Sequence, residues 1–93
     1  MARTLYELQQ QRQLLAQQIT DSLDILIGSV STKGPKRPGF NLTFKLDGLT
    51  RTRHIRAADL EKVRLMTARH KKLKQLIHKL SDINWLILCC ESE

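Results

Sequence analysis

The sequence predicts an α+β fold in which a long helix, a β-hairpin and a second long helix follow one another. Two observations predict the helices, because residues 5–26 and 63–87 each carry apolar side chains at alternating spacings of three and four. The third observation is Asp47-Gly48 between two alternating runs, a strong signal for a tight hairpin. We therefore expect one domain spanning 1–93, an antiparallel helical hairpin capped by a two-stranded ribbon.

The first helix is expected over residues 4–27. Thr4 and Glu7 have the spacing of a capping box, which satisfies the first free amides of a helix. Glutamines cover the other faces, and Thr20-Asp21-Ser22 is a weak point in the helical pattern. The apolar seam of this helix is predicted to contain Leu8, Leu15, Ile19 and Leu26.

Residues 28–39 read GSVSTKGPKRPG and are expected to form a basic loop. The segment holds three of the four glycines and both prolines. Because such residues interrupt regular structure, we expect neither a helix nor a central strand here.

A β-hairpin is expected over residues 40–56. A two-residue turn at Asp47-Gly48 would pair Phe40 with Ile55, Leu42 with Arg53, Phe44 with Arg51 and Leu46 with Leu49. This register puts two arginines in an apolar row. One explanation is that their stems cover the apolar partners or that they pair with carboxylates, and the other is that they bind phosphates.

The second helix is expected over residues 58–88, followed by a short acidic tail at 91–93. Asp59 and Glu61 suit its first turn, where the helix dipole is positive. His70 and Asn84 interrupt the seam and are expected to fix register or oligomeric state. The apolar seam positions are Val63, Met66, Leu73, Ile77, Leu80 and Ile87.

Burial predicts a homodimer. Two helices leave much of their apolar stripe in water, and a two-stranded ribbon is marginal by itself. A four-helix arrangement of two copies would bury both stripes.

The charge pattern predicts an anionic partner. The chain carries a net charge of +7 and has a pI near 9.9, and residues 33–80 alone sum to +11. Because a two-stranded ribbon fits the major groove, we expect a nucleic acid bound by an accessory or regulatory protein, with DNA favoured over RNA and RNA left open. The predicted contact residues are Lys33, Lys36, Arg37, Lys45, Arg51, Arg53, His54, Arg56, Arg64, Lys71, Lys72 and Lys74.

Three other interpretations remain open. The basic run Arg69–Lys74 is typical of a solvated helix face. The chain is also compatible with a protein-interaction module whose positive charge meets an acidic partner protein. A weaker alternative attaches the second helix to an anionic membrane surface, although its apolar stripe is needed internally.

The sequence favours no enzyme class. The acids are too few and scattered for a nucleophile, base and carboxylate to be assigned, and no Gly-rich phosphate loop follows a strand. His54, His70 and His78 lack metal-ligand spacing, so we expect no metal and no cofactor. Adjacent Cys89-Cys90 disfavour a disulfide and suggest the reducing cytoplasm. No signal peptide and no apolar run of ~20 residues is present, so no membrane span is expected.

Several short segments between residues 25 and 87 resemble a small uncharacterised bacterial and archaeal domain often associated with transposable elements. That domain usually has a cysteine cluster and a His-Gly-Pro step before its hairpin, whereas this chain has TKGPKRPG there. The resemblance implies an association with mobile elements and a role in nucleic-acid handling. It implies no metal or redox role for the loop of this chain. The matching segments are Ile27–Val30, Pro38–Phe40, Asp47–Arg53 and Leu60–Arg64.

Overall fold

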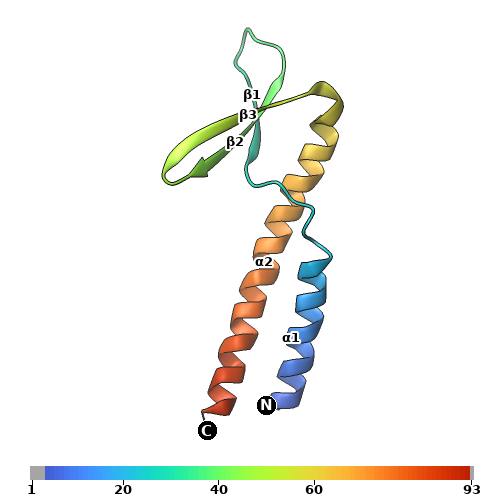
Figure 1. The fold of residues 1–93 in the computed structure, drawn as a ribbon, viewed down its shortest axis with the longest axis vertical. Helices are drawn as coiled ribbons and strands as arrows, with labels where there is room; N and C mark the ends of the chain where they lie inside the picture. Colours follow the sequence, from blue (N-terminus) through green and yellow to red (C-terminus); the bar gives the residue numbers. More distant parts are fainter. Residues whose placement is uncertain (1–3, 93) are drawn as a thin grey trace. The chain divides into compact units, whose positions relative to one another are not determined.

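The computed structural model describes residues 4–92 and contains two helices and three strands (Figure 1). The chain divides into two compact units. We call Asp24–His70 the sheet unit, and we call the chain up to Leu23 together with the part from Lys71 onward the helical unit. In chain order the elements are α1 (Leu5–Thr20), β1 (Ser29–Thr32), β2 (Phe40–Leu46), β3 (Leu49–Ile55), a 3₁₀ turn (Ala57–Asp59) and α2 (Leu60–Glu91).

The prediction of a two-stranded ribbon between two helices was wrong, because the sheet has three strands. The antiparallel order is β1-β2-β3, and β1 pairs Ser29 with Thr43 and Thr32 with Phe40. All glycines and prolines of the expected loop lie outside these four residues, and Val30 and Thr32 are β-branched. The fold is therefore α+β with a three-stranded antiparallel sheet between the helices.

Gly28 allows β1 to approach β2 closely. Its φ is +135°, and a Cβ built at this position would lie 2.6 Å from the carbonyl oxygen of Thr43. Only glycine fits both the backbone angle and the space, so this residue marks the entry into the strand.

The predicted hairpin register is confirmed. β2 and β3 pair Phe40 with Ile55 at one end and Leu46 with Leu49 at the other. Asp47 and Gly48 both have positive φ, at 54° and 78°, as a type I′ turn requires.

The core of the sheet unit lies between the sheet and the first turns of α2. Leu42, Ile55 and Val63 are buried there. The segment before β1 is tied to α2, since Arg69 Nη1 donates to the Asp24 carbonyl oxygen at 2.6 Å and to its Oδ2 at 3.1 Å. Partly buried side chains pack around this core from Leu26, Val30, Phe40 and Leu60.

α1 begins where the sequence predicts but ends earlier. Thr4 caps the helix, its Oγ1 accepting from the Glu7 amide at 3.1 Å. The expected end near residue 27 is corrected to Thr20. There the hydroxyls of Thr20 and Ser22 donate to carbonyl oxygens four residues back, and such local bonds compete with continuation of the helix.

In the helical unit, α1 lies beside the C-terminal half of α2 (Figure 1). The core is small and consists of Leu8, Ile83 and Ile87, with Leu15 and Cys90 packed against it. Leu8 is only 1% exposed and is the most completely buried large side chain of the described chain.

The buried seam of α2 differs from the predicted one at alternate positions. Leu73 and Ile87 are buried as expected, but Leu76 and Ile83 are buried in place of Ile77 and Asn84. Ile77 is 49% exposed. Leu76 and Ile83 belong to a row of residues spaced seven apart that continues to Cys90. This row is more apolar than the row that contains His70, Ile77 and Asn84.

The bounds of α2 also differ from the expected 58–88. The helix begins at Leu60 because Ala57–Asp59 form a 3₁₀ turn, and it continues to Glu91. Glu91 was expected in the acidic tail 91–93, of which residue 93 lies outside the described residues.

Candidate nucleic-acid interface

The β2–β3 hairpin projects as a two-stranded ribbon beyond the rest of the sheet. β1 pairs only with residues 40–43 of β2, so Phe44–Arg51 has no third strand. Lys45 and Arg51 are exposed on this part of the hairpin, and Arg53 is exposed just beyond it, opposite Leu42. We call these three residues the ribbon cluster.

This geometry explains why two arginines occupy an apolar row. The row is buried at Leu42 and Ile55, where α2 covers it, and becomes exposed toward the turn. The Cζ atom of Arg53 lies 5.1 Å from the centroid of the Phe44 ring. Arg53 thus covers an aromatic ring while its side chain remains accessible, an arrangement typical of guanidinium groups.

A second set of basic side chains lies toward the other end of β2. The loop after β1 is closed by hydrogen bonds from the Lys33 amide to Gly39 O and from the Arg37 amide to Gly34 O, both 3.3 Å. The guanidinium of Arg64 stacks over Phe40, 5.6 Å from the ring centroid. We call this set the loop-end cluster: Lys33, Lys36, Arg37, His54, Arg56 and Arg64.

The two clusters lie toward opposite ends of the sheet and adjoin at Arg53 and His54, which follow each other in β3. β2 separates the loop from the hairpin turn, and the two connections lie at opposite ends of the sheet (Figure 1). At about 3.3 Å per residue, the strand places the two connections about 20 Å apart. The sequence does not reveal the strand direction between the two segments, so it could not assign these residues to different ends of the sheet.

Few of the predicted contact residues are neutralised by carboxylates. Arg56 Nε lies 2.8 Å from Asp59 Oδ2, an exposed pair of small energetic weight. Within residues 4–92 the other predicted contact residues take part in no ion pair. Arg69 is paired with Asp24, so it serves the fold of the sheet unit.

The three predicted lysines of the second helix belong to the helical unit. Lys71, Lys72 and Lys74 are exposed on α2. They are therefore a set separate from the two clusters of the sheet unit.

Sequence reasoning missed three residues of the sheet unit. Lys62 is an exposed cation in the first turn of α2, signalled only by its charge. Phe40 and Phe44 hold Arg64 and Arg53 in place. The sequence allowed arginine stems to cover the apolar residues directly opposite them, but it did not predict the diagonal contact of Arg53 with Phe44 or the contact of Arg64 with Phe40, since diagonal contacts depend on the strand twist.

No protein-family model, curated protein or solved structure matches the chain. Among the described residues, no helix combines the length and apolar character needed to cross a membrane.

Proposed function

We propose that the sheet unit binds nucleic acid, as part of a small accessory or regulatory protein. The observation that carries this proposal is the charge of that unit. It holds ten Lys and Arg against four Asp and Glu, a net of +6, and most of these cations are exposed. A concentration of uncompensated positive charge on one unit favours a polyanion.

The ribbon suits duplex DNA. The major groove is about 12 Å wide and admits a two-stranded ribbon. Arg51 and Arg53 lie on one face of the ribbon, and the hydroxyls of Thr50 and Thr52 lie on the other. Both kinds of group donate hydrogen bonds to phosphate oxygens.

The loop-end cluster supplies further phosphate contacts about 20 Å along the sheet from the turn. Contacts of this kind position a protein on the duplex but do not read its sequence, so we expect weak sequence preference. RNA duplexes have a deep, narrow major groove that would exclude the ribbon, and binding to them is expected to be weaker.

Fluorescence anisotropy of a labelled DNA duplex, titrated at several salt concentrations, tests the proposal. Each phosphate contact contributes about 0.9 to the slope of log K against log salt. Arg51→Gln should therefore lower affinity and reduce that slope by about 0.9. Arg12→Gln removes the same charge from the helical unit and is the matched control, expected to leave the slope unchanged.

Absence of binding at low salt would contradict the proposal. Equal losses in Arg51→Gln and Arg12→Gln would show that net charge matters and that the ribbon does not. An RNA duplex of the same sequence, titrated in parallel, tests the preference for DNA.

The lysines of α2 are included in the proposal as an additional contact set. Replacing Lys71, Lys72 and Lys74 by glutamate should weaken DNA binding while helix content, measured by far-ultraviolet circular dichroism, stays the same. These side chains are exposed, so their replacement removes no buried contact.

An association of this protein with transposable elements is supported only by the sequence resemblance of Asp47–Arg53 and its neighbouring segments. The exposed thiol of Cys89 supports the reducing cytoplasm as the compartment.

A second candidate function, a protein-interaction module, is favoured by exposed apolar side chains of the helical unit. They include Leu14, Trp85, Leu86 and Leu88. Large exposed apolar side chains are typical of surfaces that contact other proteins, and Leu14 and Leu86 line one groove.

A further inference from the structure

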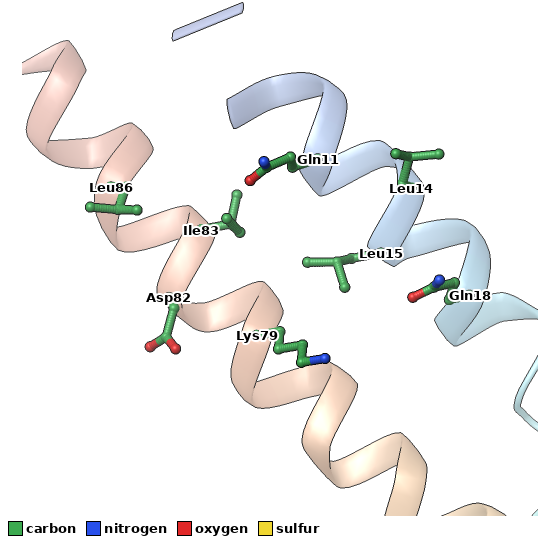
Figure 2. Close-up of a pocket in the computed structure, with 8 residues that line it drawn as sticks. All are labelled: Gln11, Leu14, Leu15, Gln18, Lys79, Asp82, Ile83 and Leu86. Carbon is green, nitrogen blue, oxygen red and sulfur yellow. The ribbon is translucent and has the colours of Figure 1, made fainter. Parts of the chain in front are cut away.

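The two sides of the α1–α2 pair differ in chemistry. One side has a groove of about 460 Å³, whose apolar lining includes Leu14, Leu15, Ile83 and Leu86 (Figure 2). The residues of α1 that line it recur at spacings of three and four, so they share one face of the helix. We call this the apolar groove.

The groove on the other side of the pair is the more polar of the two, and we call it the polar groove. Its α1 lining includes Gln9, Gln10, Arg12 and Gln13, which lie on the opposite face of that helix, and Ala16 and Leu80 also line it. Glutamine and arginine side chains are readily hydrated. The apolar groove therefore has the greater need of a partner.

Large apolar side chains are left in water at the apolar groove. Leu14 is 68% exposed and Leu86 is 41% exposed.

The charges beside the apolar groove indicate which partner fits. Lys79 and Asp82 both line it, three residues apart on α2, and have opposite signs. Within residues 4–92 neither takes part in an ion pair. Gln11 and Gln18 contribute no charge on the α1 side.

A surface with one charge of each sign is complementary to itself. In a two-fold symmetric dimer the same patch meets its copy in the reverse direction. Lys79 then faces the partner's Asp82, and Asp82 faces the partner's Lys79. A uniformly basic or acidic partner would satisfy only one of the two charges.

We propose that the apolar groove is the interface of a homodimer, in which Leu14 and Leu86 are covered by the second copy and Lys79 pairs with the partner's Asp82. This proposal identifies a surface independent of the basic clusters. The test of the dimer is therefore independent of nucleic-acid binding.

Sedimentation equilibrium of the full chain tests it through a charge exchange. The wild-type chain should have twice the 10.8 kDa monomer mass. Lys79→Glu places two acids together across the interface, and Asp82→Lys places two bases together, so each should weaken dimerisation at least tenfold. The double variant, Lys79→Glu with Asp82→Lys, restores opposite charges and should recover most of the affinity.

Two further variants complete the experiment. Leu14→Glu should give a monomer, because it puts a charge into the apolar groove, and circular dichroism should show unchanged helix content. Gln13→Glu introduces the same charge into the polar groove and is expected to leave the mass unchanged.

A monomeric wild-type chain overturns the proposal, whatever other protein it binds. So does a dimer whose dissociation constant is the same in the wild type and in both single charge variants. If Leu14→Glu fails to fold, the charge exchange decides alone, since Lys79 and Asp82 are exposed.

Discussion

The sheet unit and the helical unit are nearly equal in length but differ in surface chemistry. The sheet unit has a net charge of +6, whereas the helical unit has six Lys and Arg against five Asp and Glu, a net of +1. Large exposed hydrophobic side chains show the reverse distribution. The helical unit has Leu5, Tyr6, Leu14, Leu23, Ile77, Trp85, Leu86 and Leu88, and the sheet unit has Ile27, Leu46, Leu49 and Leu65.

This difference teaches that charge and exposed apolar surface are concentrated in different units of this small chain. Charge in the sheet unit favours a phosphate polymer, while apolar surface in the helical unit favours another protein chain. α2 contributes residues to both units, so it connects the two surfaces covalently. Variants that damage one unit at a time test this division.

The largest expected effect is on the helical unit, from Leu8→Ala. Leu8 is 1% exposed and belongs to a buried cluster with Ile83 and Ile87. Truncation should lower the free energy of unfolding by about 2–5 kcal/mol, since it removes buried methyl groups and leaves a cavity. Urea unfolding followed at 222 nm measures this.

Tyr6→Ala is the control for Leu8→Ala, because Tyr6 lies in the same turn of α1 and is 69% exposed. Its effect should stay within about 0.5 kcal/mol. All variants must be compared at one protein concentration, because dimerisation would otherwise change the apparent stability. Similar losses in both would mean that the α1–α2 core is not formed as described.

A smaller effect is expected on the sheet unit, from Gly28→Ala. The added methyl group would meet Thr43 O at 2.6 Å, and the φ of +135° is strained for any residue with a side chain. We expect a loss of about 2 kcal/mol, concentrated in β1. Hydrogen exchange of the β1 amides should accelerate.

Gly34→Ala separates strain from steric contact. Gly34 has nearly the same φ, +130°, but no atom lies within 4 Å of its Cβ position. This variant should therefore lose less stability than Gly28→Ala. Equal losses would mean that β1 does not lie against β2 as closely as the structure has it.

The smallest effect is expected from Thr4→Ala, which removes the hydroxyl that caps α1. The Glu7 amide would lose its 3.1 Å hydrogen bond, at a cost of about 1 kcal/mol. Thr4→Ser retains the hydroxyl and should be nearly neutral. Thermal unfolding measured by circular dichroism distinguishes the two, and an equal loss in both would argue against the cap.

Local sequence signals predicted the parts of the fold that depend on a few adjacent residues. Asp47-Gly48 set the hairpin register because a type I′ turn fixes both strands that leave it. Thr4 marked the start of α1 for a similar reason, since a capping hydroxyl acts on an amide three residues away. The basic residues of the sheet unit were also evident, because exposed charge is a property of composition.

The candidate interface was predicted only as a set of residues. The sequence named the cations of both clusters but could not assign them to the two ends of the sheet, because that assignment depends on the course of β2. It left Arg69 out of the contact set but did not predict its pairing with Asp24. A pairing across 45 residues leaves no local pattern.

By itself the sequence therefore determined the hairpin, the start of α1, the two helices and the charge excess of the middle of the chain. Only the tertiary structure decided that Ser29–Thr32 is a strand, that α1 ends at Thr20, and that α2 buries Leu76 and Ile83 instead of Ile77 and Asn84. The physical reason is that a turn or a cap gains its stabilising bonds within a few residues. A four-residue edge strand gains them only when β2 is beside it, and a helix seam is selected only by what packs against it.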